Sequence, residues 1–81
     1  GEPVEARREK VRGRVAERVV GREQPRVAEF LGELIGTPFP HEESPPLRAA
    51  RKDAQLMTEQ MRLAFIEFVA AECAAFVVAI S

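Results

Sequence analysis

The sequence contains a single cysteine, Cys73, among its 81 residues. An internal disulfide is therefore excluded, and the cysteine usage gives no indication of a secreted protein. The N-terminal segment is charged and lacks the apolar core of a signal peptide. The C-terminal apolar run is interrupted by Glu67 and Glu72 and is shorter than the roughly 20 apolar residues of a membrane span. These absences predict a cytoplasmic protein that does not enter the membrane.

The sequence also lacks the short motifs that indicate catalysis. It has no GxxxxGK(S/T) phosphate loop, no GxGxxG, no CxxC and no plausible nucleophile–base pair. The only histidine, His41, lies in "HEESP", which is not the HExxH motif of zinc enzymes, so we expect a solvated side chain. Cys73 lies among alanines and is expected to be a buried, unreactive thiol. We predict no catalytic, cofactor-binding or metal-binding residues, no cofactor and no enzymatic activity for this chain alone.

Charge is unevenly distributed, although the formal net charge is only -1. The segment from residue 7 to 26 carries eight basic residues against three glutamates, so its charge is +5 and that of the remaining chain is -6. The basic residues are Arg7, Arg8, Lys10, Arg12, Arg14, Arg18, Arg22 and Arg26. The segment has no aromatic residue for base stacking. A solvated charged face is the favoured interpretation, with weak, non-specific nucleic-acid binding as an alternative.

The N-terminal half predicts two helices within a single domain. The first covers residues 3–20, begins at Pro3, carries a valine stripe and is weakened by Gly13. The second covers residues 24–35 and ends at Gly36. Its apolar face recurs at helical spacing. That face consists of Val27, Phe30, Leu31, Leu34 and Ile35.

The C-terminal half predicts a proline-rich loop, a long helix and a short extended end. The loop covers residues 36–46, and Ser44 is placed to cap a short turn through Lys52. The main helix covers residues 53–76, with Met57 and Met61 in its core-facing side. "FVVAI" then indicates a buried strand. The predicted fold class is all-α as the chain stands: three helices with a short C-terminal extended segment. The apolar pattern of the C-terminal half is typical of the interior of a layered α/β domain.

The main helix has more apolar surface than the first two helices can cover. One of its faces carries Met57, Met61, Ala64, Phe65, Phe68 and Ala75, and the other carries Leu56, Leu63, Ile66, Ala70 and Ala74. We expect the flank of Leu63, Ile66 and Ala70 to be exposed, and the chain to self-associate through Leu63, Phe65, Ile66 and Phe68 or to be marginally stable. Glu72 falls by helical angle on the apolar face, where it is either a functional buried carboxylate or, as we favour, an exposed one.

Two stretches carry a family resemblance. "RVAEFLGELIGTPFP" (26–40) and "SPPLRAARKDAQLMTEQMRLAFIEFVAAECAA" (44–75) resemble the AAA-like ATPase module of bacterial regulators that join such a module to a serine/threonine protein kinase domain. The resemblance covers residues 2–75 and places them between the Walker A loop and the Walker B strand of an α/β P-loop NTPase domain. At Phe76 the chain departs from the family, which continues into an apolar strand ending in paired acidic residues.

The resemblance implies a fragment of a signalling ATPase that has no activity of its own, and a partner surface in the rest of the parent ATPase domain. Two alternatives follow from the residues themselves. The first is a small helical protein-interaction or oligomerisation module, and the second is the nucleic-acid binder described above.

Overall fold

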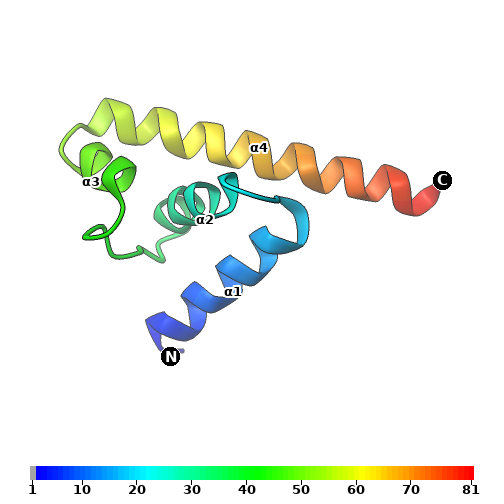
Figure 1. The fold of residues 1–81 in the computed structure, drawn as a ribbon, viewed down its shortest axis with the longest axis horizontal. Coiled ribbons are helices and arrows are strands. Elements are labelled where there is room, and N and C mark those ends of the chain that lie inside the picture. Colours follow the sequence, from blue (N-terminus) through cyan, green and yellow to red (C-terminus); the bar gives the residue numbers. More distant parts are fainter. Residues whose placement is uncertain (1) are drawn as a thin grey trace.

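Four helices make up the fold. The computed structural model describes residues 2–81, which form α1 (Val4–Arg18), α2 (Glu23–Leu34), α3 (Pro45–Arg51) and α4 (Ala54–Ile80). In Figure 1, α4 runs the length of the molecule, α1, α2 and α3 lie on one side of it, and its C-terminal part extends beyond them. The all-α class is confirmed. The predicted count of three helices is wrong, because the short turn after Ser44 is a helix of its own.

The extended segment predicted at residues 76–80 is also wrong. Phe76 to Ile80 continue α4, which reaches 27 residues and about 40 Å. A lone strand leaves its backbone N–H and C=O groups without partners, whereas a helix satisfies them within the segment. The start of the helix is as predicted: the carboxylate of Asp53 accepts hydrogen bonds from the N–H groups of Gln55 (3.1 Å) and Leu56 (3.2 Å).

Two glycines with left-handed backbone conformations lie after the first two helices. Gly36 (φ 78°) follows α2 directly after its C-cap Ile35, as predicted. Gly21 (φ 75°) does not end α1 as predicted, because the helix already ends at Arg18 and its C-cap Val19 is extended; Gly21 lies in the turn that follows. The ends of α1 and α2 still fall within two residues of the predicted ends.

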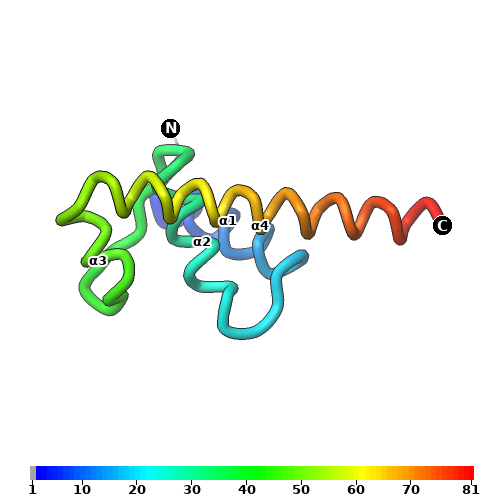
Figure 2. The backbone as a smooth tube through the Cα atoms, turned by 90° about the horizontal axis from the view of Figure 1, so that it is seen from above, coloured from blue at the N-terminus to red at the C-terminus, as the bar shows by residue number. Residues whose placement is uncertain are grey.

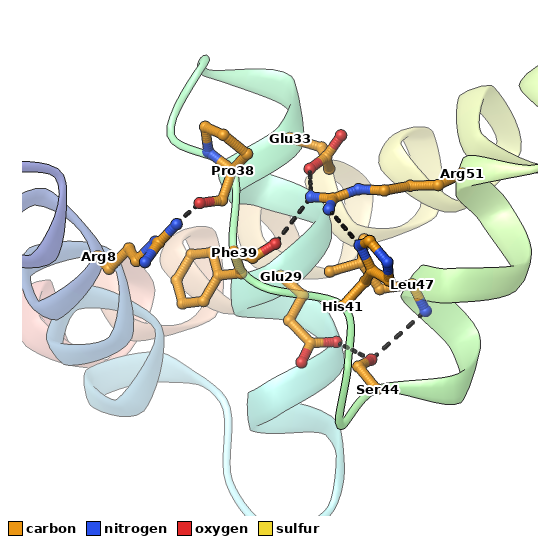
Figure 3. A network of polar contacts seen from close by, with 9 residues as sticks. All are labelled: Arg8, Glu29, Glu33, Pro38, Phe39, His41, Ser44, Leu47 and Arg51. Carbon is orange, nitrogen blue, oxygen red and sulfur yellow. Dashed lines mark hydrogen bonds and ion pairs between the residues drawn. The ribbon is translucent and has the colours of Figure 1, made fainter.

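The proline-rich loop is held against the helices by polar contacts (Figure 3). The side-chain hydroxyl of Ser44 accepts a hydrogen bond from the N–H of Leu47 (3.4 Å) and donates one to Glu29 Oε1 (2.7 Å). This confirms Ser44 as the cap of the short segment. At the other end of the loop, Arg8 donates to the carbonyl of Pro38 and Arg51 donates to the carbonyl of Phe39, both at 2.8 Å.

The core lies between α2 and its neighbours, and α4 contributes little to it. The fully buried large side chains are Phe30, Leu47, Val15 and Val27. Ala64 is the one residue of α4 that is buried. Met57 and Met61, predicted as core, are partly buried against this cluster together with Leu56 and Phe68. A 27-residue helix therefore packs mainly through one narrow strip of side chains on its N-terminal two thirds.

Candidate interaction surface

The side of α4 that faces away from the other helices is apolar and uncovered. Figures 1 and 2 show α1, α2 and α3 on the same side of α4. The large side chains on the opposite side are about half exposed, among them Leu63 (44%) and Ile66 (52%). We call this side the outward face; it consists of Leu63, Phe65, Ile66, Val69, Ala70, Cys73, Ala74, Phe76, Val77 and Ile80. The predicted exposure of Leu63, Ile66 and Ala70 is confirmed.

No charged side chain interrupts the outward face from Leu63 to Ile80. Eighteen helical residues extend about 27 Å, so the face is long as well as apolar. Its area is on the order of 700 Å², because its seven large apolar side chains each leave roughly 100 Å² in water. The largest apolar patch of a typical monomer is about 300–600 Å². A patch above that range indicates an interaction surface.

The two glutamates of this helix segment point toward the body of the molecule. Glu67 Oε2 lies 2.6 Å from Arg26 Nη2 on α2. Glu72 lies between two arginines of α1, with Oε1 2.9 Å from Arg14 Nη2 and Oε2 3.3 Å from Arg18 Nε. The ion pairs draw both carboxylates to the inner side of α4. The outward face is free of charge because of this arrangement.

The favoured prediction that Glu72 is exposed is wrong, since its side chain is only 27% exposed. Glu72 also does not resemble a catalytic carboxylate, because two guanidinium groups surround it. The contacts are ionic rather than well-aligned hydrogen bonds. Within residues 2–81, Glu72 Oε1 and Arg18 Nε are shielded from water and have no hydrogen-bond partner. The pairing holds the middle of α4 on α1 at some cost in desolvation.

Arg26 joins α2 to α4 through a second ion pair. Burial lowers the pKa of its guanidinium, but hydrogen bonds to Glu23 and Glu67 outweigh this effect, so the pKa lies above its ordinary value. A raised pKa on a basic group means that its contribution to stability is lost only as the pH rises through that value. Arg26 therefore stays charged across the whole neutral and acidic range.

The basic segment is largely neutralised by neighbouring carboxylates. Ion pairs join Arg8 to Glu5 (2.7 Å) and Arg14 to Glu17 (3.3 Å). Further pairs join Lys10 to Glu2, Arg12 to Glu9 and Arg26 to Glu23. The guanidinium of Arg12 also lies 4.9 Å from the centre of the Phe39 ring, in a cation–π contact. The positive charge that a duplex would contact is thus engaged within the protein, which favours the solvated-face interpretation.

Cys73 and His41 were predicted to be a buried thiol and a solvated imidazole, respectively. Cys73 is exposed, so the prediction of a buried thiol is wrong. The alanines around it suggested a core position, but nothing in residues 2–81 covers this part of α4. His41 is half-buried, and its Nδ1 lies 2.9 Å from Arg51 Nη1. Among the described residues, no group of three metal-ligating side chains gathers around either residue.

A groove beside α4 extends the outward face, and sequence reasoning missed it. Its volume is about 370 Å³, and it is lined by Leu34, Thr58, Met61, Arg62 and Phe65. Leu34 and Ile35 belong to the predicted apolar face of the second helix, but at its end they are 46% and 61% exposed. A larger cleft of about 540 Å³ lies between Arg12, the start of α2 and the proline-rich loop. It carries Glu29, Glu42 and Glu43, of which Glu29 is bonded to Ser44.

The length and hydropathy of α4 also meet the criteria for a membrane-spanning helix. An 18-residue window of α4 has a mean hydropathy of 2.2, and only 6% of it is buried within the protein. Core helices of soluble proteins meet the same criteria of length and hydropathy, but they are mostly buried. Comparison with known protein families, curated proteins and solved structures finds no match to this chain.

Proposed function

We propose that this chain is a non-catalytic helical interaction module whose outward face on α4 packs against another protein surface. The observation that carries the proposal is the charge-free face from Leu63 to Ile80. This face is exposed to solvent, because the other three helices pack on the opposite side of α4. The body formed by α1, α2 and α3 serves to position and hold α4. Its arginines pair with Glu67 and Glu72, which are the only charged residues of α4 from Leu63 to Ile80.

The two glutamates favour a protein surface over a membrane as the partner of α4. The hydrocarbon core of a bilayer is about 30 Å thick, which corresponds to about 20 helical residues. A span of that length within α4 would place Glu67 and Glu72 in the bilayer and separate them from their arginines, which is costly. Helices that lie on anionic membranes carry Lys and Arg on their polar face, whereas the polar side of α4 from Leu63 to Ile80 carries Glu67 and Glu72. The proposed location is accordingly the cytoplasm.

The resemblance to kinase-linked ATPase regulators supplies a second, more specific candidate. In that reading the chain is a helical part of the ATPase module, and α4 packs on the layered sheet of the same module. The observation that favours it is the last part of α4, which is apolar on every side: Phe76 is 65% exposed, Val78 is 75% exposed and Ile80 is 67% exposed. A helix that is apolar all round is normally buried all round.

The isolated chain should bind ATP negligibly under either candidate. Phosphate binding needs a cradle of backbone N–H groups, a lysine and a ligand for Mg²⁺, and the sequence contains no loop that supplies them. Titration of ATP–Mg²⁺ into the chain should therefore give no saturable heat in a calorimeter. Saturable binding in the micromolar range would contradict the non-catalytic assignment.

The availability of the outward face is tested with a dye that fluoresces on apolar surfaces. The dilute chain should enhance the fluorescence of anilinonaphthalene sulfonate, and Ile66→Glu should reduce the enhancement severalfold, because it places a charge in the middle of the face. Ala16→Glu, at an exposed position on α1, is the matched control and should change nothing. Equal dye binding by all three proteins would show that the face is not the apolar surface that the proposal requires.

A further inference from the structure

We infer that the outward face binds a second copy of this chain, in a parallel, in-register pair of α4 helices. The inference rests on the proposed function, since it names the partner of the same surface. It adds a register and an orientation that the general proposal does not contain. Three observations carry it: a heptad pattern, a charge pair across the two-fold axis, and the area of the face.

The outward face contains an uninterrupted coiled-coil seam. Apolar residues recur at alternating intervals of three and four, which is the spacing of the a and d positions of a heptad. The six seam residues are Leu63, Ile66, Ala70, Cys73, Val77 and Ile80, and all are exposed. None of them is needed to close the core, whose only α4 member is Ala64. Two heptads and more of exposed a and d positions have no explanation within one copy.

The seam is placed so that two copies do not collide. By helical angle the seam lies on the side of α4 opposite the buried Ala64. Figures 1 and 2 show how α1, α2 and α3 are grouped on one side of α4. When two α4 helices meet along their seams, each helical body stands on the outside of the pair. The small side chains of Ala70 and Cys73 at the centre of the seam allow the helices to approach closely.

Charge complementarity selects the parallel orientation. With Leu63 at position a, Arg62 takes position g and Glu67 takes position e of the same turn of the pattern. In a parallel pair, position g of one helix faces the e position five residues later on the other, so Arg62 of each copy meets Glu67 of the second copy. Arg62 is exposed and forms no ion pair within residues 2–81, and Glu67 remains 44% exposed beside Arg26. An antiparallel pair centred on the seam brings no charges together.

The area of the face suits a stable pair. A standard-size interface buries about 800 Å² on each partner, and the outward face leaves apolar surface on the order of 700 Å² in water. Because the interface is isologous, the same residues serve both copies. A monomer would have to keep all of this surface hydrated.

Cys73 provides the test of a second copy, because it occupies a d position near the centre of the seam and faces Cys73 of the second copy in the parallel, in-register pair. Oxidised glutathione converts the two thiols to one disulfide and is itself reduced to two molecules of glutathione. We expect the wild-type chain to form the disulfide-linked dimer at least about tenfold faster than random collision allows, since pairing raises the effective thiol concentration toward the millimolar range. The collision control is Ala16→Cys combined with Cys73→Ala, which places the only thiol at an exposed position on α1.

The orientation is checked separately by charge. Arg62→Glu should slow the cross-linking of Cys73 severalfold, since it sets two glutamates against each other, whereas the neutral Arg62→Gln should slow it less. Cross-linking of Cys73 no faster than that of the Ala16→Cys control would overturn the parallel pair. If the chain also sediments as a monomer while its dye binding remains sensitive to Ile66→Glu, the second copy is excluded as the partner but the interaction module stands. If the chain sediments as a monomer and its dye binding is also insensitive to Ile66→Glu, the proposed function is overturned as well.

Discussion

The double variant Leu63→Glu with Ile66→Glu should remain helical and lose the ability to associate. Both side chains are about half exposed, so glutamates at these positions stay in water in the monomer. In the pair they would replace four apolar side chains with four negative charges facing one another. If each lost side chain costs about 1 kcal/mol, the dissociation constant should rise roughly 1000-fold. Sedimentation measures the association, and far-ultraviolet circular dichroism measures the helix content.

A control variant of equal charge separates a specific contact from general repulsion. Ala16→Glu with Gln55→Glu adds the same two charges at exposed positions outside the seam. It should associate almost as the wild type does. If this control dissociates as completely as the Leu63 and Ile66 variant, then net charge rather than the outward face controls association. If the Leu63 and Ile66 variant unfolds, these residues belong to a core that the structure does not show.

The second large effect is expected at Gly32, in the last turn of α2. A Cβ atom added there would lie 2.5 Å from the carbonyl oxygen of Thr37 and 2.7 Å from the Phe39 ring. The Thr37 contact is with backbone that returns tightly after α2, where the N–H of Thr37 donates to the carbonyl of Gly32 (2.8 Å). Gly32→Ala should therefore destabilise the fold by about 3 kcal/mol. For a domain of this size that corresponds to a fall of about 15 °C in melting temperature.

Gly13 provides the matched control for this substitution. It is also helical, but an added Cβ atom would meet nothing within 4 Å. Gly13→Ala should stabilise α1 by about 1 kcal/mol and raise the melting temperature by about 5 °C, because alanine has the higher helix propensity. Thermal melts of the two variants should thus move in opposite directions. A Gly32→Ala variant that melts with or above the wild type would show that the loop from Thr37 to Phe39 does not pack against α2 as described.

Sequence signals that act within a few residues predicted the helices well. Features that depend on residues far apart in the sequence were missed. Gly36 ended α2 and Ser44 capped α3 because such signals act within a few residues. The strand predicted at residues 76–80 failed for the opposite reason. A short β-branched run is compatible with strand or helix, and only the presence of a pairing strand decides between them. With no strand elsewhere in residues 2–81, the run continues α4.

The candidate surface was predicted in outline but not in detail. An excess of apolar faces over covering helices can be counted from spacing alone, and it correctly indicated the exposure of Leu63 and Ile66. The pairing of Glu72 with Arg14 and Arg18 depends on how α1 crosses α4, which no spacing within either helix reveals. The exposure of Cys73 has the same origin, because alanine neighbours show that a position is apolar and not whether anything covers it.

Sedimentation equilibrium of the wild-type chain over a wide concentration range tests the central claim most directly. A free apolar face on α4 predicts that the average mass rises with concentration from that of one chain toward that of two. A chain that stays monomeric at every concentration, and melts cooperatively at high temperature, would contradict the claim. It would mean that these 81 residues bury enough of α4 on their own, and that the outward face needs no partner.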